Sequence, residues 1–381
     1  MLNFDRQATG SLPKWWRNVD KQILFLIIFL FLLGLLFSFS STSSMVGEKL
    51  NKETYFLFIK HFIFVFISLT LLFVISIQER KNIEKFLIPI FLITVLFLVL
   101  VPFVGVEVKG SKRWIELPFI PRFQPIEFVK PLFILLSAKI ITGSNNKSMY
   151  LRYFLSFLIL SFIVLLLLNQ PDVGQTLLIV FSWITMVFVS GVSVMVLLSL
   201  GFIFIGIVVL TLYLFPSKFG YVYSRLLTFF DPNKGDNFQS QKALDAIKQG
   251  GLTGRGMGEG ILKDRVPEAH TDYIIAVISE EFGIILVLII VFIFLFISYK
   301  TINQIFFEKE EFVKLALIGL VSLLIYQTFI HLGVNTRLLP TTGMTLPFLS
   351  YGGSSLVGSS IIAGIILNFT RKGSTGYKEY E

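Results

Sequence analysis

Long apolar runs recur along this chain of 381 residues, and they constrain its fold more than any other feature. A helix needs about 20 mostly apolar residues to cross the hydrocarbon core of a bilayer. Within that core the backbone must satisfy its own hydrogen bonds, so only helices and closed barrels span it. Hydrophobic residues make up 54% of the chain and charged residues only 15%. The sequence therefore predicts an all-α polytopic membrane protein.

The apolar runs predict about ten membrane-spanning helices. They cover residues 22–40, 55–77, 86–106, 124–142, 151–169, 173–190, 193–215, 272–299, 312–332 and 348–370. The first run follows a basic segment and is longer than the core of a cleavable signal, so we expect it to be retained as a helix. We interpret residues 1–381 as a single membrane domain with one long loop, 216–271, between the seventh and eighth helices.

The distribution of Lys and Arg predicts which side of the membrane each loop faces. An even number of spans places both ends of the chain on one side. Basic residues are more frequent in the terminal tails and the loops on that side than in the short loops on the other. Because short cytoplasmic loops carry such an excess, we expect cytoplasmic termini and an outward-facing loop 216–271. The net charge of +9 is then explained by basic loops that face anionic lipid headgroups, so it does not indicate binding of nucleic acid.

A polar cluster stands at the start of the eighth apolar run, in "PEAHTDYIIAVISEEFG", residues 267–283. Thr271 or Asp272 could simply cap the helix that follows. Alternatively, Asp272 is a carboxylate at the outer surface, near the positive end of a helix, where it stays ionised and takes a proton from a hydroxyl. The two interpretations are compatible, and His270 could position Asp272.

Glu280 and Glu281 lie deeper in the same run. Ionisable side chains inside a span are costly, so they normally face the protein interior or water and have partners. Adjacent residues on a helix point about 100° apart, so both cannot line one groove equally. Internal hydrogen bonds and a substrate contact are equally good explanations at this stage.

The segment "GSKRWIELPFIPRFQPIEFVKPL", residues 110–132, combines basic and aromatic residues at a membrane interface. Lys112 and Arg113 next to Trp114 are typical of an interfacial anchor, or of a clamp for phosphate and sugar. Glu127 and Lys130 are three residues apart on the next helix, where they can pair. A charged pair at membrane depth is a functional hypothesis by default.

Two Pro and three Gly interrupt the segment "LLPTTGMTLPFLSYGGSS", residues 338–355. Non-helical backbone near membrane depth is tolerated only where it is buried in protein or lines a cavity. Ser350 and its polar neighbours are therefore candidates to line one. The run "GRGMGEG" does not follow a strand, so it does not predict a dinucleotide site. The chain has no Cys and only three scattered His, which makes a zinc cage improbable.

Several segments together resemble the SEDS family, named for shape, elongation, division and sporulation. They are "RLLTFFDP" (225–232), "AIKQGGLTGRGMGEG" (246–260), "PEAHTDYIIAVISEEFG" (267–283), "LPFLSYGGSS" (346–355), "GSKRWI" (110–115), "QPIEFVK" (124–130) and "QPDVGQT" (170–176). The resemblance covers nearly the whole chain in the right order. It is closer to the division branch of the family than to the elongation branch.

The resemblance implies a peptidoglycan glycosyltransferase of the bacterial cytoplasmic membrane, working at the division septum. Its substrate would be lipid II, a disaccharide-pentapeptide on undecaprenyl pyrophosphate, and the essential aspartate of the family falls on Asp272. The expected partners are a class B penicillin-binding protein, which is a transpeptidase, and other division proteins. The leaving pyrophosphate needs positive charge, so the candidates are Lys112, Arg113, Lys130 and Arg225, with Mg²⁺ or Mn²⁺ as a possible addition.

Two departures from the family pattern and two alternative functions stay open. Ile126 stands where the family pattern has Ser, so a local hydroxyl is missing. Thr342 stands where many relatives carry Lys, and Arg337 is a possible substitute for that charge. A lipid II flippase would use the intramembrane residues Glu127, Lys130, Glu280 and Glu281 equally well, and a scaffold for the transpeptidase would need no chemistry. The position of the essential carboxylate distinguishes an enzyme from a flippase: outer surface for a polymerase, midspan for a flippase.

Overall fold

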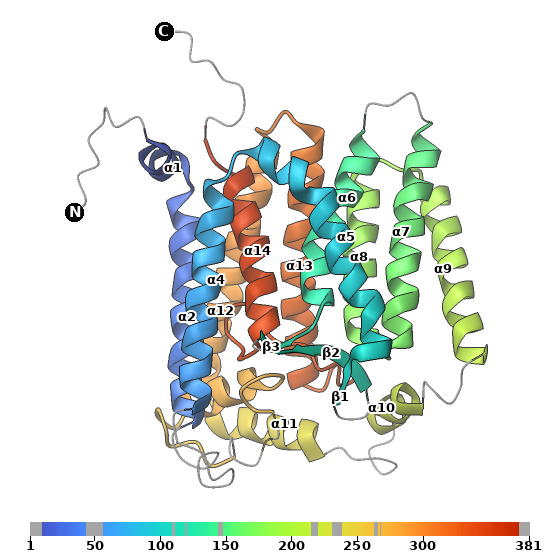
Figure 1. Cartoon of the computed structure of the whole chain (residues 1–381). Helices are drawn as coiled ribbons and strands as arrows, with labels where there is room; N and C mark the ends of the chain where they lie inside the picture. Colours follow the sequence, from blue (N-terminus) through green and yellow to red (C-terminus); the bar gives the residue numbers. More distant parts are fainter. Residues whose placement is uncertain are drawn as a thin grey trace.

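The computed structural model describes residues 10–42, 56–108, 111–118, 120–143, 148–214, 220–230, 238–262, 266 and 268–372. Parts of the expected loops 41–54, 143–152 and 216–271 lie outside these residues. Each of the ten predicted spans coincides with a helix of the bundle in Figure 1. In chain order these helices are α2 (Lys21–Thr42), α4 (Phe56–Ile77), α5 (Arg80–Val104), α6 (Ile126–Thr142), α7 (Met149–Asn169), α8 (Val173–Val189), α9 (Val194–Leu214), α12 (Ile274–Ile305), α13 (Glu311–Asn335) and α14 (Gly353–Phe369).

Six of the described helices, α2, α4, α5, α7, α12 and α13, are long and apolar enough to cross a bilayer by themselves. Helices α6, α8 and α14 have 17 residues each, or about 25 Å, which is short of a hydrocarbon core of about 30 Å. Before α14, non-helical backbone extends the short helix across the rest of the hydrocarbon core, and Leu346, Phe348 and Leu349 of this segment are fully buried. The prediction of irregular backbone in residues 338–355 is therefore confirmed up to Gly352, and burial is confirmed for residue 344 and residues 346–350, whereas Leu338 and Leu339 are exposed.

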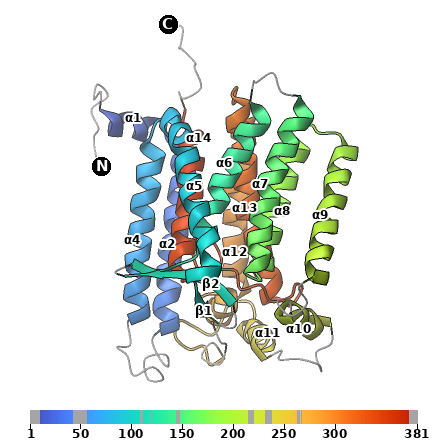
Figure 2. The same cartoon turned by 45° about the vertical axis from the view of Figure 1, so that its right-hand side comes forward.

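The smaller elements are divided between the two ends of the bundle. Helix α1 (Ser11–Asn18) lies beside the C-terminal end of α14 at one end, as an even number of spans requires (Figures 1 and 2). Helices α10 (Gly220–Phe230) and α11 (Phe238–Gly250) lie at the other end, with an antiparallel sheet of β1 (Val106–Val108), β2 (Ser111–Leu117) and β3 (Ile120–Phe123). We call this second end the outer face, following the sidedness that the basic residues predict.

Helices α13 and α14 stand in the middle of the bundle and pack closely through small residues. A Cβ on Gly364 of α14 would lie 2.9 Å from the Cβ of Ile75 in α4, and one on Gly34 of α2 would lie 2.9 Å from the carbonyl oxygen of Phe348. Such small residues let backbones approach where lipid gives helices no hydrophobic reason to associate. The close packing places the buried loop before α14 against the interior of the bundle.

Helix α12 is broken at Gly283, which has a φ of 82°, and a glycine-rich loop fills the gap. The backbone N–H of Arg255 donates to the carbonyl of Glu280 at 2.9 Å, and the N–H of Ile284 donates to the carbonyl of Gly251 at 3.1 Å. The loop thus replaces the helical hydrogen bonds that the break removes. A Cβ on Gly283 would lie 2.1 Å from the carbonyl oxygen of Leu252, so only glycine fits there.

The two adjacent glutamates of α12 hold this loop in place. Glu280 is fully buried, and its Oε1 accepts hydrogen bonds from the N–H groups of Ile261 and Leu262, both at 2.7 Å. Glu281 accepts a bond from the N–H of Gly258 at 3.2 Å. Of the two explanations open from the sequence, internal hydrogen bonding is confirmed. Burial of the carboxylates is tolerated because backbone donors satisfy them.

Candidate active site

The turn that carries Asp272 lies on the outer face, immediately before α12. Glu268 has a φ of 59°, and its carbonyl accepts hydrogen bonds from the N–H groups of Thr271 and Asp272, both at 3.1 Å. The N-cap of α12 is Tyr273, without a side-chain capping bond, and the Thr271 hydroxyl donates to the Glu268 carboxylate at 3.0 Å. The expected cap at Thr271 or Asp272 is therefore not formed, because the turn places the helix start one residue later.

The loop before α14 fixes the backbone of this turn. The Ser350 hydroxyl donates to the carbonyl of Thr271 at 2.7 Å, and the N–H of Tyr351 donates to the carbonyl of His270 at 2.9 Å. The His270 ring also contacts the Tyr351 ring in a tilted arrangement, with centroids 5.8 Å apart. Ser350 was predicted to line a cavity, and here it connects two segments that lie about 80 residues apart in sequence.

Asn335, the last residue of α13, supports Asp272 from a third direction. It is fully buried, and its Nδ2 donates to the backbone carbonyl of Asp272 at 3.0 Å. The carboxylate of Asp272 points toward Gly343, where a Cβ would lie 3.6 Å from Oδ2. The Glu268 turn and Asn335 thus hold the Asp272 backbone directly, and the loop before α14 holds the two residues that precede it.

Arg225 on α10 brings positive charge to Asp272. Its Nη1 donates to the carbonyl of Thr341 at 2.7 Å, two residues before Gly343. Burial lowers the pKa of Arg225 to about 10, and the positive charge of Arg113 acts in the same direction, whereas Asp272 raises it. Arg225 therefore stays protonated at neutral pH, and its positive charge acts on the Asp272 carboxylate.

Tyr273 follows Asp272 directly and also faces Arg225. Burial raises the pKa of its phenol above the ordinary value, and the charge of Asp272 adds to this effect. The phenol is therefore neutral at physiological pH and acts as a hydrogen-bond donor. Its buried hydroxyl has no hydrogen-bond partner among the described residues, so it is positioned to bind an incoming polar group.

Arg113 on β2 makes a second cationic position on the same face. It donates to the carbonyls of residues 170 and 171 at 3.2 and 2.5 Å, and its Nη1 lies 3.7 Å from Oδ1 of Asp172. Asp172 caps α8 by accepting a bond from the N–H of Gln175, and it also accepts one from Gln124. Arg113 and Asp172 therefore connect the sheet to the start of α8.

The predicted pair between Glu127 and Lys130 is confirmed and lies deeper in the bundle. Lys130 Nζ is 2.8 Å from Glu127 Oε2, and the two side chains are 1% and 5% exposed. Gln175 donates to Glu127 at 2.7 Å, and Lys130 donates to Gln327 at 3.4 Å. Because Gln175 is also bonded to Asp172, one polar network runs from the outer face to the middle of the bundle.

Lys112 and Trp114 flank Arg113 on β2, and alternate residues of a strand point to opposite faces. Lys112 is exposed and Trp114 is half-buried, whereas Arg113 reaches toward Asp172. Of the predicted site residues, the fold brings Asp272, His270, Ser350, Arg225 and Arg113 to one region of the outer face, with Glu127 and Lys130 beneath it. Lys112 and Trp114 remain at its edge.

Residues that the sequence argument did not select are Asn335 and Tyr273, together with Gln175 and Gln327 of the deeper network. A polar side chain inside an apolar span was the available signal for three of them. Among the described residues, no group of three or more His, Cys, Asp or Glu side chains could hold a metal ion.

Fold and site together define a multi-pass membrane protein with a fixed carboxylate, Asp272, and the positive charge of Arg225 at one face. Residues 21–375 match the family described as "Cell cycle protein", FtsW/RodA/SpoVE. A "Probable peptidoglycan glycosyltransferase FtsW" of Caulobacter vibrioides is 32% identical over 98% of this chain and 95% of that relative. The chain therefore belongs to the FtsW/RodA/SpoVE family, which is the SEDS family.

Solved structures agree with this assignment. One described as "Structural coordination of polymerization and crosslinking by a peptidoglycan synthase complex" has a TM-score of 0.72 and 26% identity, covering 92% of this chain and 97% of its own. The rod shape determining protein RodA of Thermus thermophilus has a TM-score of 0.66 and 25% identity, covering 93% of this chain and 97% of its own. The resemblance expected from the sequence is confirmed.

Proposed function

We propose that this protein is a peptidoglycan glycosyltransferase that polymerises lipid II, with Asp272 as the general base. The observation that carries the proposal is the position of Asp272: Asn335 bonds its backbone carbonyl, Ser350 fixes the residue before it, and the positive charge of Arg225 acts on its carboxylate. The names of the relatives support the reaction class. The division branch is favoured because the relatives with about one-third identity are named FtsW.

The reaction that this arrangement supports is a single displacement. The 4-hydroxyl of an acceptor GlcNAc attacks the anomeric carbon of the MurNAc of the growing chain, and Asp272 takes the hydroxyl proton as the new C–O bond forms. The bond from that carbon to the pyrophosphate breaks, and undecaprenyl pyrophosphate leaves with the electron pair. One carboxylate acting as base fits inversion at the carbon, by analogy with inverting glycosidases.

Arg225 and Arg113 suit the leaving group in this scheme. A pyrophosphate that gains negative charge near a low-dielectric bundle needs fixed positive charges, and arginine can bind phosphate oxygens with two parallel N–H groups. Arg225 stays protonated at neutral pH, and Tyr273 adds a neutral donor beside it. A divalent cation shared by Asp272 and the pyrophosphate would supply further charge neutralisation.

The proposed setting is the bacterial cytoplasmic membrane at the division septum. The termini would face the cytoplasm and the Asp272 face would meet lipid II in the outer leaflet, because basic residues favour the terminal side. A class B penicillin-binding protein is the proposed partner, since a structural neighbour is described as part of a peptidoglycan synthase complex. That partner would crosslink the strands that this protein polymerises.

A lipid II flippase is the second candidate, and the buried pair of Glu127 and Lys130 favours it. An ionisable pair at membrane depth is typical of transport pathways. However, the pair is bonded to Gln175 and Gln327 and is only 1% and 5% exposed, which supports a structural role equally. A flippase would not depend on the carboxylate at the outer face.

The deciding experiment measures glycan polymer made from labelled lipid II by purified protein, with and without the partner transpeptidase. Asp272→Asn keeps the size of the side chain and removes the proton acceptor. We expect at least about a hundredfold less polymer, even at saturating lipid II, because the loss is in the chemical step. Thermal stability should be unchanged, since Asp272 does not cap α12.

Glu116→Gln is the matched control for Asp272→Asn. Glu116 also carries a carboxylate on the outer face, but it is half-exposed and pairs with Arg122 across the sheet. This variant should retain wild-type activity. Substantial polymer from well-folded Asp272→Asn protein would overturn the catalytic assignment and place the flippase or the scaffold first.

A further inference from the structure

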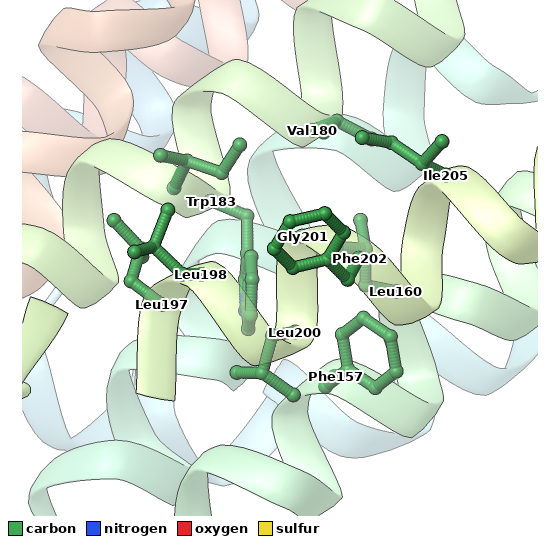
Figure 3. Close-up of a pocket in the computed structure, with 11 residues that line it drawn as sticks. Phe157, Leu160, Val180, Trp183, Leu197, Leu198, Leu200, Gly201, Phe202 and Ile205 are labelled. Atoms are coloured by element: carbon green, nitrogen blue, oxygen red, sulfur yellow. The ribbon is translucent and has the colours of Figure 1, made fainter. Parts of the chain in front are cut away.

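An apolar crevice lies between α7, α8 and α9, inside the part of the bundle that the membrane covers. It has a volume of about 220 Å³, and its lining comes from all three helices: Phe157, Leu160, Val180, Trp183, Ile184, Leu197, Leu198, Leu200, Gly201, Phe202 and Ile205. Figure 3 shows the aromatic side chains of Phe157, Trp183 and Phe202 among them. Helix α9 stands at the edge of the bundle in both views, so the crevice adjoins the surrounding lipid (Figures 1 and 2).

The walls of the crevice accept hydrocarbon and exclude headgroups. Trp183 is the only lining residue with a polar side-chain atom, and its indole N–H already donates to the hydroxyl of Ser156 at 2.8 Å. A sugar or phosphate placed here would lose its hydrogen bonds to water and gain none. The volume is also below the usual range of about 300–1,000 Å³ for sites that enclose a whole small molecule. One segment of a lipid chain fits these limits.

Part of the crevice lining runs along α9, whose far end points to the face that carries the candidate active site. Its lining residues on α9 run from Leu197 to Ile205, which is about 12 Å along the helix axis. Ile205 lies about 14 Å before the end of α9 at Leu214. Beyond that end lies α10, which carries Arg225 and sits below α8 and α9 (Figures 1 and 2). A chain leaving a pyrophosphate at Arg225 and descending along α9 therefore enters the crevice.

We propose that this crevice binds part of the isoprenoid tail of the lipid-linked substrate. The inference rests on the proposed function, which puts the pyrophosphate of that substrate at Arg225. Once the pyrophosphate is bound, its own tail reaches the crevice at a high effective concentration, whereas bilayer acyl chains have no such tether. The methyl branches and double bonds of an isoprenoid chain pack against the aromatic walls.

Gly201 keeps the crevice open and provides the test. It lines the crevice, and a Cβ built on it meets no atom within 4 Å. Gly206, five residues later on the same helix, also has open space around its Cβ, but it does not line the crevice. Replacing either glycine removes a residue that disfavours helix, so neither variant should unfold α9. Gly201→Phe fills the crevice, and Gly206→Phe is its matched control.

The first measurement compares polymerisation of lipid II with its full undecaprenyl tail and of an analogue with a short prenyl tail. We expect Gly201→Phe to raise KM for the long-tailed substrate roughly tenfold, which corresponds to about 1.4 kcal/mol, with kcat little changed. KM for the short-tailed analogue should stay at the wild-type value. Gly206→Phe should match wild type with both. Equal KM values for both variants with the long tail would overturn the proposal.

The second measurement needs no turnover, so it decides the question even if wild-type protein makes no polymer and the proposed function fails. Lipid II carrying a photoreactive diazirine in its prenyl tail is bound to the protein and irradiated. We expect label in the peptides that contain residues 157–160 and 197–205, and its loss in Gly201→Phe. Displacement of this label by an excess of phosphatidylethanolamine would show ordinary bilayer lipid in the crevice and overturn the inference.

Discussion

Replacing Lys130 by Met should destabilise this protein far more than a typical single substitution. Lys130 is 1% exposed and lies 2.8 Å from Glu127, so the change leaves a buried carboxylate without its counter-charge. Gln175 still donates one hydrogen bond to Glu127, but that neutral amide cannot balance a full charge. Breaking a buried pair by removing one partner costs about 3–5 kcal/mol. That corresponds to roughly a hundredfold to several-thousandfold rise in the unfolding constant.

The matched double variant, Glu127→Gln with Lys130→Met, should recover most of this loss. Neutral residues of similar volume often replace a buried ion pair at little or no cost. The side chain of Gln at position 127 can still accept the bond from Gln175. The assay is thermal unfolding of purified protein in detergent, for wild type, both single variants and the double variant, analysed as a double-mutant cycle. Polymerisation by the double variant then separates a structural pair from a catalytic one.

Two outcomes would refute this reasoning. If Lys130→Met unfolds at the wild-type temperature, the pair is not a desolvated ion pair. If the double variant is no more stable than Lys130→Met, then the unbalanced charge of Glu127 is not the cause of the loss. A stable double variant that makes no glycan would instead show that the charges of Glu127 and Lys130 are needed for polymerisation.

The structure and the charge distribution lead to three further predictions. A reporter fused after residue 263 should lie on the outer side of the membrane, and one fused after Glu308 should lie in the cytoplasm. Alkaline phosphatase and a fluorescent protein, fused in turn at each position, would report the two sides. The reverse result would contradict the predicted sidedness. Gly283→Ala should prevent folding, seen as loss of the monodisperse protein peak, because its Cβ would lie 2.1 Å from the Leu252 carbonyl oxygen. Burial alone would raise the pKa of Glu308, but hydrogen bonds from Arg80 and the backbone bring it below its ordinary 4.5. Its contribution to stability is therefore complete above pH 4.5 and lost as pH falls through the folded-state pKa, so Glu308→Gln should flatten the acid limb of a melting-temperature curve.

The sequence predicted the spans well because hydropathy alone decides them. Ten helices occupy the expected ranges, and the boundary between the fifth and sixth spans, residues 170–172, separates α7 from α8 as predicted. The pair of Glu127 and Lys130 was also predictable, because three residues on a helix bring two side chains to one face. These predictions depend only on local spacing, which a single sequence contains.

The break in α12 could not be predicted in the same way. Hydropathy continues through Gly283, and the residues that fill the gap come from about 30 positions earlier in the chain. Two buried glutamates beside a glycine were the only local sign, and they fitted a substrate contact equally well. The support of Asp272 by Asn335 and Ser350 is likewise a product of packing between distant segments. The sequence shows which residues are polar, but not which backbone group each one satisfies.

Thr342 stands where the resemblance leads us to expect a lysine, and another residue brings positive charge to this position. Thr342 packs against α8, where a Cβ built on Gly174 would lie 2.9 Å from the Cβ of Thr342. The hydroxyl of Thr342 is buried. Arg337, the substitute considered from the sequence, donates to Gln241 at 2.6 Å and so attaches α11 to the bundle. Arg225 instead bonds to the carbonyl of Thr341, directly beside position 342, and it faces Asp272. The positive charge that acts on Asp272 therefore comes from α10, so the placement of α10 sets the charge balance around the proposed base.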